Sequence, residues 1–123
     1  MFGEMRTAAL LAKAVANDAS ALPAALALRM ATLNGARALG LGDETGSLEQ
    51  GKAADIVAVR LDAIECQPFY NVISQLVYAT GRDKVSDVWV AGRQLLKERE
   101  LLTVDTPTVL ARAQIWRERI EKT

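Results

Sequence analysis

The 123-residue sequence contains no histidine and only one cysteine, Cys66. Histidine is the usual acid–base group near neutral pH and the commonest transition-metal ligand. Its absence excludes Ser-His-Asp catalysis, Cys-His catalysis and histidine zinc sites within these residues. A single cysteine forms no internal disulfide, and a thiol without an imidazole partner is predicted to be structural.

The chain also lacks an excess of either charge and any long hydrophobic run. Basic and acidic residues number 15 each, whereas nucleic-acid-binding proteins usually carry a basic excess. No apolar run approaches the roughly 18 residues of a membrane span. The apolar start is interrupted by Glu4, Arg6 and Lys13, unlike a signal peptide. The sequence therefore predicts a cytoplasmic protein that binds neither nucleic acid nor membrane.

Half of the residues are hydrophobic, which is enough to build a core. Apolar spacing and turn residues predict helices at 3–17, 24–31 and 32–39, a strand at 55–60, a helix opened by Pro68, a hairpin at 85–97 around Ala91-Gly92, and a final helix capped by Thr106. A sheet this small needs a partner layer to be stable.

Several side chains of these elements are expected to be buried. In the strand these are Ile56, Val57 and Val59, which would pack into a sandwich. In the last helix the expected buried stripe is Val109, Leu110, Ala113, Trp116 and Ile120. Trp89 and Trp116 are interpreted as packing residues because burial is the usual fate of large aromatics.

The glycine-rich segment after residue 40 offers two functional interpretations, and both are weak. Gly40 and Gly42 begin like a dinucleotide-binding loop, but Thr45 stands where the third glycine belongs and no strand precedes them. Asp43 and Glu44 lack the alternating acidic spacing of a calcium loop. A helix cap followed by turns fits this segment better.

Two stretches are more specific than the rest of the chain. Residues 32–40 read TLNGARALG, and residues 46–57 read GSLEQGKAADIV. Gly51 is predicted to adopt positive φ, so that the chain turns tightly before the strand. The Asp55 carboxylate is placed to accept backbone N–H groups at the strand entrance. The small Gly35 and Ala36 would let their helix approach a neighbour closely.

These stretches resemble the C-terminal motif of the amidohydrolase superfamily, in which T-x-N-G-A-x-x-L-G leads into G-S-L-x-x-G-K-x-A-D-I-V. The matching positions are Thr32, Asn34, Gly35, Gly46, Gly51, Lys52 and Asp55, and the roles expected of them are structural. Residues 1–6, 67–79 and 88–93 further resemble the branch of methylthioadenosine/S-adenosylhomocysteine deaminases and triazine hydrolases.

The resemblance implies an α+β fold, a fragment of an α/β metallo-dependent hydrolase. Residues 1–40 would be the last helices of a TIM-like barrel. Residues 41–105 would form the C-terminal part of a small composite β-sandwich, with an inserted helix at about 68–80. Residues 106–123 would be a C-terminal helix.

The resemblance also implies hydrolysis of C–N or C–Cl bonds on a purine or triazine-like ring, with zinc or another divalent metal as cofactor. The family's metal ligands are histidines and an aspartate, and none of them falls on a residue of this chain. We therefore assign no catalytic and no metal-binding residue. Phe2, Glu4 and Met5 would lie nearest the substrate, because they would follow the last barrel strand.

Two hypotheses follow for the chain itself. In the first, it is the C-terminal part of a hydrolase, and its partner is the N-terminal catalytic part of the same protein. In the second, it is a stand-alone, non-catalytic module derived from that family. Either way, we expect no activity from these residues alone and association into homo-oligomers, because apolar faces and strand edges would be left uncovered.

Overall fold

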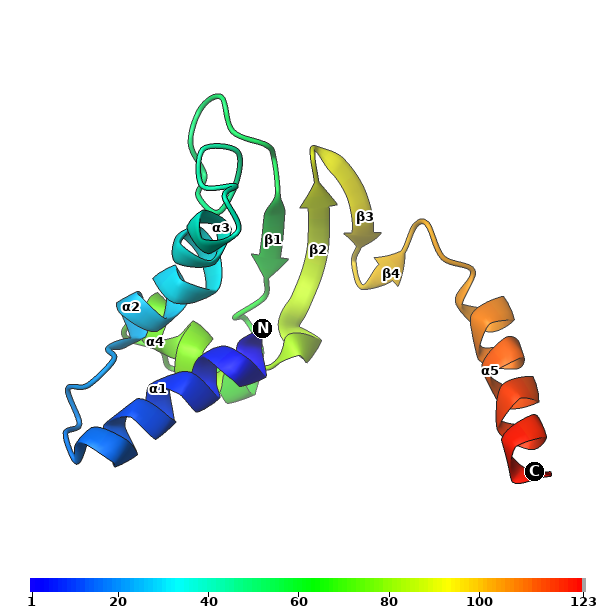
Figure 1. Cartoon of the computed structure of the whole chain (residues 1–123), viewed down its shortest axis with the longest axis horizontal. Helices are drawn as coiled ribbons and strands as arrows, with labels where there is room; N and C mark the ends of the chain where they lie inside the picture. Colours follow the sequence, from blue (N-terminus) through cyan, green and yellow to red (C-terminus); the bar gives the residue numbers. More distant parts are fainter. Residues whose placement is uncertain (123) are drawn as a thin grey trace.

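The computed structural model describes residues 1–122, which form a helical layer, one antiparallel sheet and a projecting helix (Figure 1). The helical layer contains α1 (Phe2–Ala16), α2 (Ala24–Arg29), a π-helical turn η1 (Met30–Asn34), α3 (Gly35–Ala38), α4 (Val72–Ser74) and a second π-helical turn η3 (Gln75–Ala79). The remaining elements are β1 (Ile56–Val59), β2 (Val85–Val90), β3 (Arg93–Lys97), β4 (Glu100–Leu101), α5 (Thr106–Glu121) and short 3-10 turns at Ile64–Cys66 and Arg82–Lys84. Among these helices, none is long and apolar enough to cross a membrane.

The core lies in the helical layer, where α1 crosses α2 and η3. Its buried members are Met5, Ala9, Ala27 and Val77. The two alanines let the helices approach closely, and dense packing of this kind supplies much of a small domain's stability. Cys66 is also buried, as expected for a structural thiol.

The prediction that residues 24–31 and 32–39 form two separate helices is wrong. The structure has one helical run from Ala24 to Ala38, with the π-helical turn in its middle. Neither glycine nor proline separates Ala31 from Thr32, so nothing stops the helix there. The Thr32 hydroxyl instead donates to the Leu28 carbonyl at 2.9 Å, one turn back.

The helix predicted to open at Pro68 begins at Val72. Asn71 is its N-cap, and its side-chain oxygen accepts from the Ser74 amide at 2.9 Å. An asparagine cap satisfies a free amide at a helix start, whereas proline does not. The cap therefore sets the boundary, and Pro68, which follows a cis peptide bond, lies outside the helix.

The sheet has the order β1-β2-β3-β4, and all neighbouring strands are antiparallel. The predicted hairpin is confirmed: Ala91 and Gly92 lie between β2 and β3 with φ of 48° and 77°, as a two-residue type I′ turn requires. A second tight turn was not predicted. Glu98 and Arg99 join β3 to β4 with φ of 46° and 70°, although neither residue type favours such a turn.

One apolar row crosses the whole sheet. It consists of Val57, Val88, Leu96 and Leu101, which are paired in register from β1 to β4. Val57 is 56% exposed, so the expectation that it packs into a sandwich is wrong for this chain alone. The α+β fold class is confirmed, but residues 1–122 build one sheet and provide no second layer to cover this row.

The last helix, α5, departs from expectation in its cap and in its burial. Asp105, not Thr106, is the N-cap, and its carboxylate accepts from the Thr108 amide at 3.2 Å and the Thr108 hydroxyl at 2.6 Å. The predicted buried stripe is wrong, since every described residue of the helix is exposed, Trp116 to 62%. Trp89 is half-buried in the sheet.

Candidate functional site

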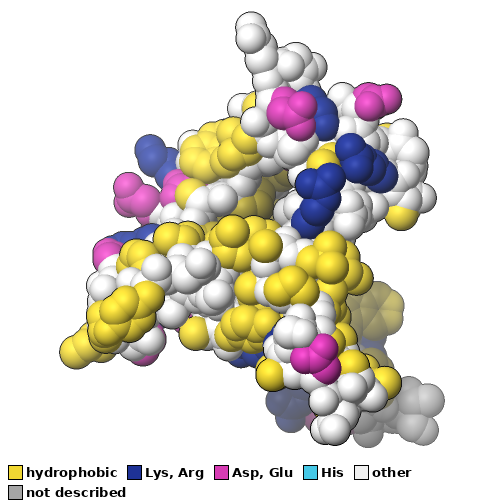
Figure 2. Space-filling model, turned by 90° about the vertical axis from the view of Figure 1, so that its left-hand side faces the viewer, with side chains coloured by type: hydrophobic (Ala, Val, Ile, Leu, Met, Phe, Trp, Pro, Cys, Tyr) yellow, Lys and Arg dark blue, Asp and Glu magenta, His cyan; other side chains and the backbone are white. Residues whose placement is uncertain are grey.

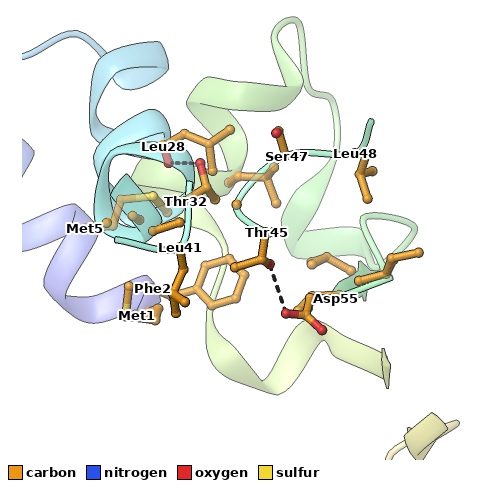
Figure 3. Close-up of a pocket in the computed structure, with 18 of the residues that line it drawn as sticks. Met1, Phe2, Met5, Leu28, Thr32, Leu41, Thr45, Ser47, Leu48 and Asp55 are labelled. Atoms are coloured by element: carbon orange, nitrogen blue, oxygen red, sulfur yellow. Dashed lines mark hydrogen bonds between the residues drawn. The ribbon is translucent and has the colours of Figure 1, made fainter. Parts of the chain in front are cut away.

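An apolar hollow of about 630 Å³ lies between α1, the α2–α3 run, the loop at 41–55 and β1 (Figure 3). Its walls include Phe2, Leu28, Leu41 and Leu48. No group of three or more histidine, cysteine, aspartate or glutamate side chains gathers anywhere in residues 1–122. The hollow can therefore bury apolar surface, but its lining offers no ligand set for a metal.

The residues expected near substrate lie in different surroundings. Phe2 is half-buried and lines the hollow, and Met5 lies beside it in the helical core (Figure 3). Glu4 is exposed and is not among the lining residues. The structure thus brings two of the three together, and their contact with substrate remains a prediction.

Lys52 stabilises the loop at 41–55 through hydrogen bonds of its side chain. Its ammonium group donates to the Gly42 carbonyl at 2.6 Å and to the Ser47 hydroxyl at 2.8 Å, and lies 3.5 Å from a Glu49 carboxylate oxygen. The Lys52 side chain is only 13% exposed. The lysine closes the loop on itself, which agrees with a structural role.

Gly46 is where this loop touches the helical layer. It has φ of +91°, and a Cβ there would lie 2.7 Å from the Ala36 Cβ and 2.9 Å from the Leu33 Cα. The close approach predicted for Gly35 and Ala36 is confirmed for Ala36 and wrong for Gly35, since a Cβ on Gly35 would meet only its own helix, at the Met30 carbonyl. The loop contributes the glycine, and the helix contributes the small, buried Ala36.

The other helical motif residues, Thr32 and Asn34, belong to the π-helical turn η1. The Thr32 hydroxyl bonds within its own helix, and Asn34 is half-buried. Gly51 has φ of +93°, as predicted, and nothing lies within 4 Å of a Cβ added there.

Asp55 joins three segments at the strand entrance, as predicted. One carboxylate oxygen accepts from the Ala91 amide at 2.7 Å, and the other accepts from the Thr45 hydroxyl at 2.9 Å. These bonds hold the pKa of the Asp55 carboxyl below its ordinary value, the Ala91 amide having the larger effect. One side chain therefore connects the loop, the start of β1 and the β2–β3 turn.

We expect Asp55→Asn to lower the melting temperature at neutral pH and to matter less as the pH falls. A depressed pKa contributes stability that is present above the ordinary pKa, near 4, and lost as the pH drops through the folded-state value. Thermal unfolding between pH 7 and pH 3 tests this. Asp43→Asn in the same loop is the control, because the Asp43 carboxylate makes no hydrogen bond within residues 1–122. A gap between wild type and Asp55→Asn that stays constant across this range would contradict the prediction.

Sequence reasoning missed Arg6, which ties α1 to the end of η3. Its guanidinium donates to the Thr80 carbonyl at 2.8 Å and to the Val77 carbonyl at 3.4 Å. Thr80 is fully buried, and its hydroxyl donates to the Gln75 carbonyl at 2.9 Å. An arginine on the half-buried side of an apolar helix was the available signal, since such a charge needs a partner.

Comparison with known proteins defines the class to which this fold and loop belong. Residues 1–95 match the model of the amidohydrolase family, and the chain belongs to that family. The similarity to the deaminase and triazine-hydrolase branch is also confirmed. The chain is 49% identical over 120 residues to the 5-methylthioadenosine/S-adenosylhomocysteine deaminase of Teredinibacter turnerae, covering 98% of this chain and 27% of that protein. For the enzyme of the same name from Saccharophagus degradans, identity is 44% over 121 residues.

Solved structures give the same result. The chain superposes on a zinc-bound adenosine deaminase from Xanthomonas campestris with a TM-score of 0.96 and 59% identity, covering 100% of this chain and 28% of that one. The zinc complex of an atrazine chlorohydrolase from Arthrobacter aurescens gives a TM-score of 0.83 and 32% identity, covering 94% and 26%. The chain thus spans about a quarter of the length of these relatives.

Proposed function

We propose that these residues act as the C-terminal part of a metal-dependent aminohydrolase that removes an amino group from a purine ring. The observation that carries the proposal is the likeness over the whole chain to a zinc-bound adenosine deaminase, at 59% identity. Dechlorination of a triazine is the second candidate, and the lower identity to the chlorohydrolase, 32%, makes it the weaker one.

The metal is proposed to be zinc or another divalent ion, which would activate water for attack on the ring carbon. The described residues do not fit such an ion, because they include no histidine and no cluster of carboxylates and thiols. The ligands would therefore belong to the rest of the enzyme. What this chain supplies is structural: a helical layer, a fastened loop and a small sheet.

The partner we propose is the remainder of the same polypeptide, carrying the barrel strands. Three uncovered features support it. The hollow is apolar, hydrophobic side chains gather over the helical face of the molecule (Figure 2), and the outer edge of β1 pairs with no strand among residues 1–122. Open strand edges and broad apolar patches attract other chains.

A chimera tests the proposed activity. These 123 residues would replace the matching 28% of the Xanthomonas campestris deaminase. We expect the zinc-loaded chimera to deaminate adenosine, methylthioadenosine or S-adenosylhomocysteine within about tenfold of the parent rate, because the ligand set is intact. A second chimera, in which these residues replace the matching 26% of the Arthrobacter aurescens chlorohydrolase and which is assayed on a chlorotriazine, tests the second candidate. A chimera that folds and holds zinc, yet turns over none of these purines, would refute the proposal.

The chain alone is expected to associate through its uncovered surfaces. Sedimentation equilibrium at micromolar concentration should give a dimer or a larger species, since burial of apolar area yields about 25 cal/mol per Å². A monomer with a sharp thermal transition would show that the residues bury their own core. That outcome would favour the alternative, a stand-alone module without catalytic function.

A further inference from the structure

The helix α5 stands clear of the other elements, at the far end of the molecule from α1 (Figure 1). Every described residue from Thr106 onward is exposed, Trp116 to 62% and Ile120 to 73%. A helix of 16 residues is marginal in water without tertiary packing. An element of this length with exposed large side chains needs a surface to cover it.

Four apolar side chains of α5 lie in one narrow stripe, and Leu110 and Ile115 lie outside it. The members of the stripe follow the spacing i, i+4, i+7, i+11, and they are Val109, Ala113, Trp116 and Ile120. This spacing places them along one side of the helix, as in a helix that packs against one apolar groove.

One flank of the stripe is basic, because Arg112 and Arg119 both lie on it. On the other flank Arg117 is already paired, its Nε lying 2.8 Å from a Glu121 carboxylate oxygen. The Arg119 guanidinium lies over the Trp116 ring, 5.2 Å from its centre. The partner surface that complements this arrangement is apolar along its centre and acidic along the edge that faces Arg112 and Arg119.

This charge pattern argues against a second α5 as the partner. Antiparallel pairing of two copies would set Arg112 and Arg119 against each other. Like charges that face each other across a helix pair destabilise it. The stripe is therefore unsuited to antiparallel pairing with itself.

The position of α5 is shared with a much longer chain. The superposition on the Xanthomonas campestris deaminase covers all of this chain, α5 included, at a TM-score of 0.96. Nearly three quarters of that deaminase lies outside the superposed region. A large amount of polypeptide is thus available to hold the helix where it stands.

We infer that α5 docks, through the Val109–Ile120 stripe, onto an apolar surface edged by aspartate or glutamate carboxylates and contributed by the same polypeptide outside these residues. The inference rests on the proposed function, because it requires the remainder of the enzyme. In this role α5 holds this part of the enzyme against the rest, and we call the contact of the Val109–Ile120 stripe with that surface the clasp.

Hydrogen exchange on the zinc-loaded chimera with the Xanthomonas campestris deaminase tests the clasp. We expect α5 amides to exchange about 100-fold more slowly than unstructured ones. Arg112→Glu should speed that exchange about tenfold, whereas Lys122→Glu, the same charge change on the opposite side, should alter it less than about twofold. Val109→Asp should expose the helix, and Ala111→Asp, also on the opposite side, should not.

Three results would overturn the inference. The first is an unprotected α5. The second is protection that appears only as the chimera dimerises, which would identify a second copy as the partner. The third is an equal effect of Arg112→Glu and Lys122→Glu on the exchange rate, which would show that no acidic edge faces Arg112. Deaminase activity of the same sample separates the two proposals: an active chimera with unprotected α5 refutes the clasp alone, and an inactive one with protected α5 refutes the function alone.

Discussion

Replacing Gly46 with valine is expected to lower the free energy of unfolding by roughly 3–5 kcal/mol. Two costs add. The backbone has φ of +91°, which a β-branched residue resists, and the first side-chain carbon would lie 2.7 Å from Ala36 and 2.9 Å from the Leu33 backbone. The loop would have to leave the helical layer to accommodate it.

Gly51→Val is the matched control for this prediction. Gly51 has nearly the same φ, +93°, but nothing lies within 4 Å of an added Cβ. Gly51→Val should therefore lower the free energy of unfolding by the backbone cost alone, about 1–2 kcal/mol. Urea unfolding of both variants gives the comparison. Equal destabilisation by the two substitutions would show that the contact between Gly46 and the helix contributes nothing.

The second large effect is expected from Arg6→Met, which keeps most of the side chain's length and removes its charge. The carbonyl of the fully buried Thr80 would lose its hydrogen bond from the guanidinium. The substitution should therefore lower the free energy of unfolding by about 2–3 kcal/mol. Arg29→Met on α2 is the control, since Arg29 is exposed and makes no side-chain hydrogen bond or ion pair within residues 1–122, and it should cost less than about 0.5 kcal/mol. Similar melting temperatures for the two variants would contradict the assigned role of Arg6.

Most of the features that sequence alone predicted are set by local chemistry. The Ala91-Gly92 turn and the positive φ of Gly51 each depend on a few neighbouring residues. The Asp55 bond is the exception: a carboxylate at a strand entrance was expected to accept a backbone N–H, but the donor, Ala91, lies 36 residues along the chain. The family could also be recognised, because its two motifs concentrate in residues 32–57. The start of α4 was misplaced because Pro68 was weighed above Asn71, although the asparagine makes the capping bond.

The features that sequence missed depend on distant contacts. Apolar spacing correctly identified α5 as a helix, but spacing says nothing of what covers its apolar side chains, and within residues 1–122 nothing does. Val57 was misjudged for the same reason. The bond from Arg6 to Thr80 joins residues 74 positions apart, and the contact of Gly46 with Ala36 depends on how the loop folds back onto the helix. Only the folded arrangement reveals such pairs.

The central proposal is that these residues complete a metal-dependent enzyme without holding its metal. Zinc titration by calorimetry tests it most directly, on the 123-residue chain and on the chimera with the Xanthomonas campestris deaminase. The account predicts no specific zinc binding by the chain, whose described residues contain no ligand cluster, and tight binding by the chimera. Stoichiometric, tight zinc binding by the chain alone would contradict it.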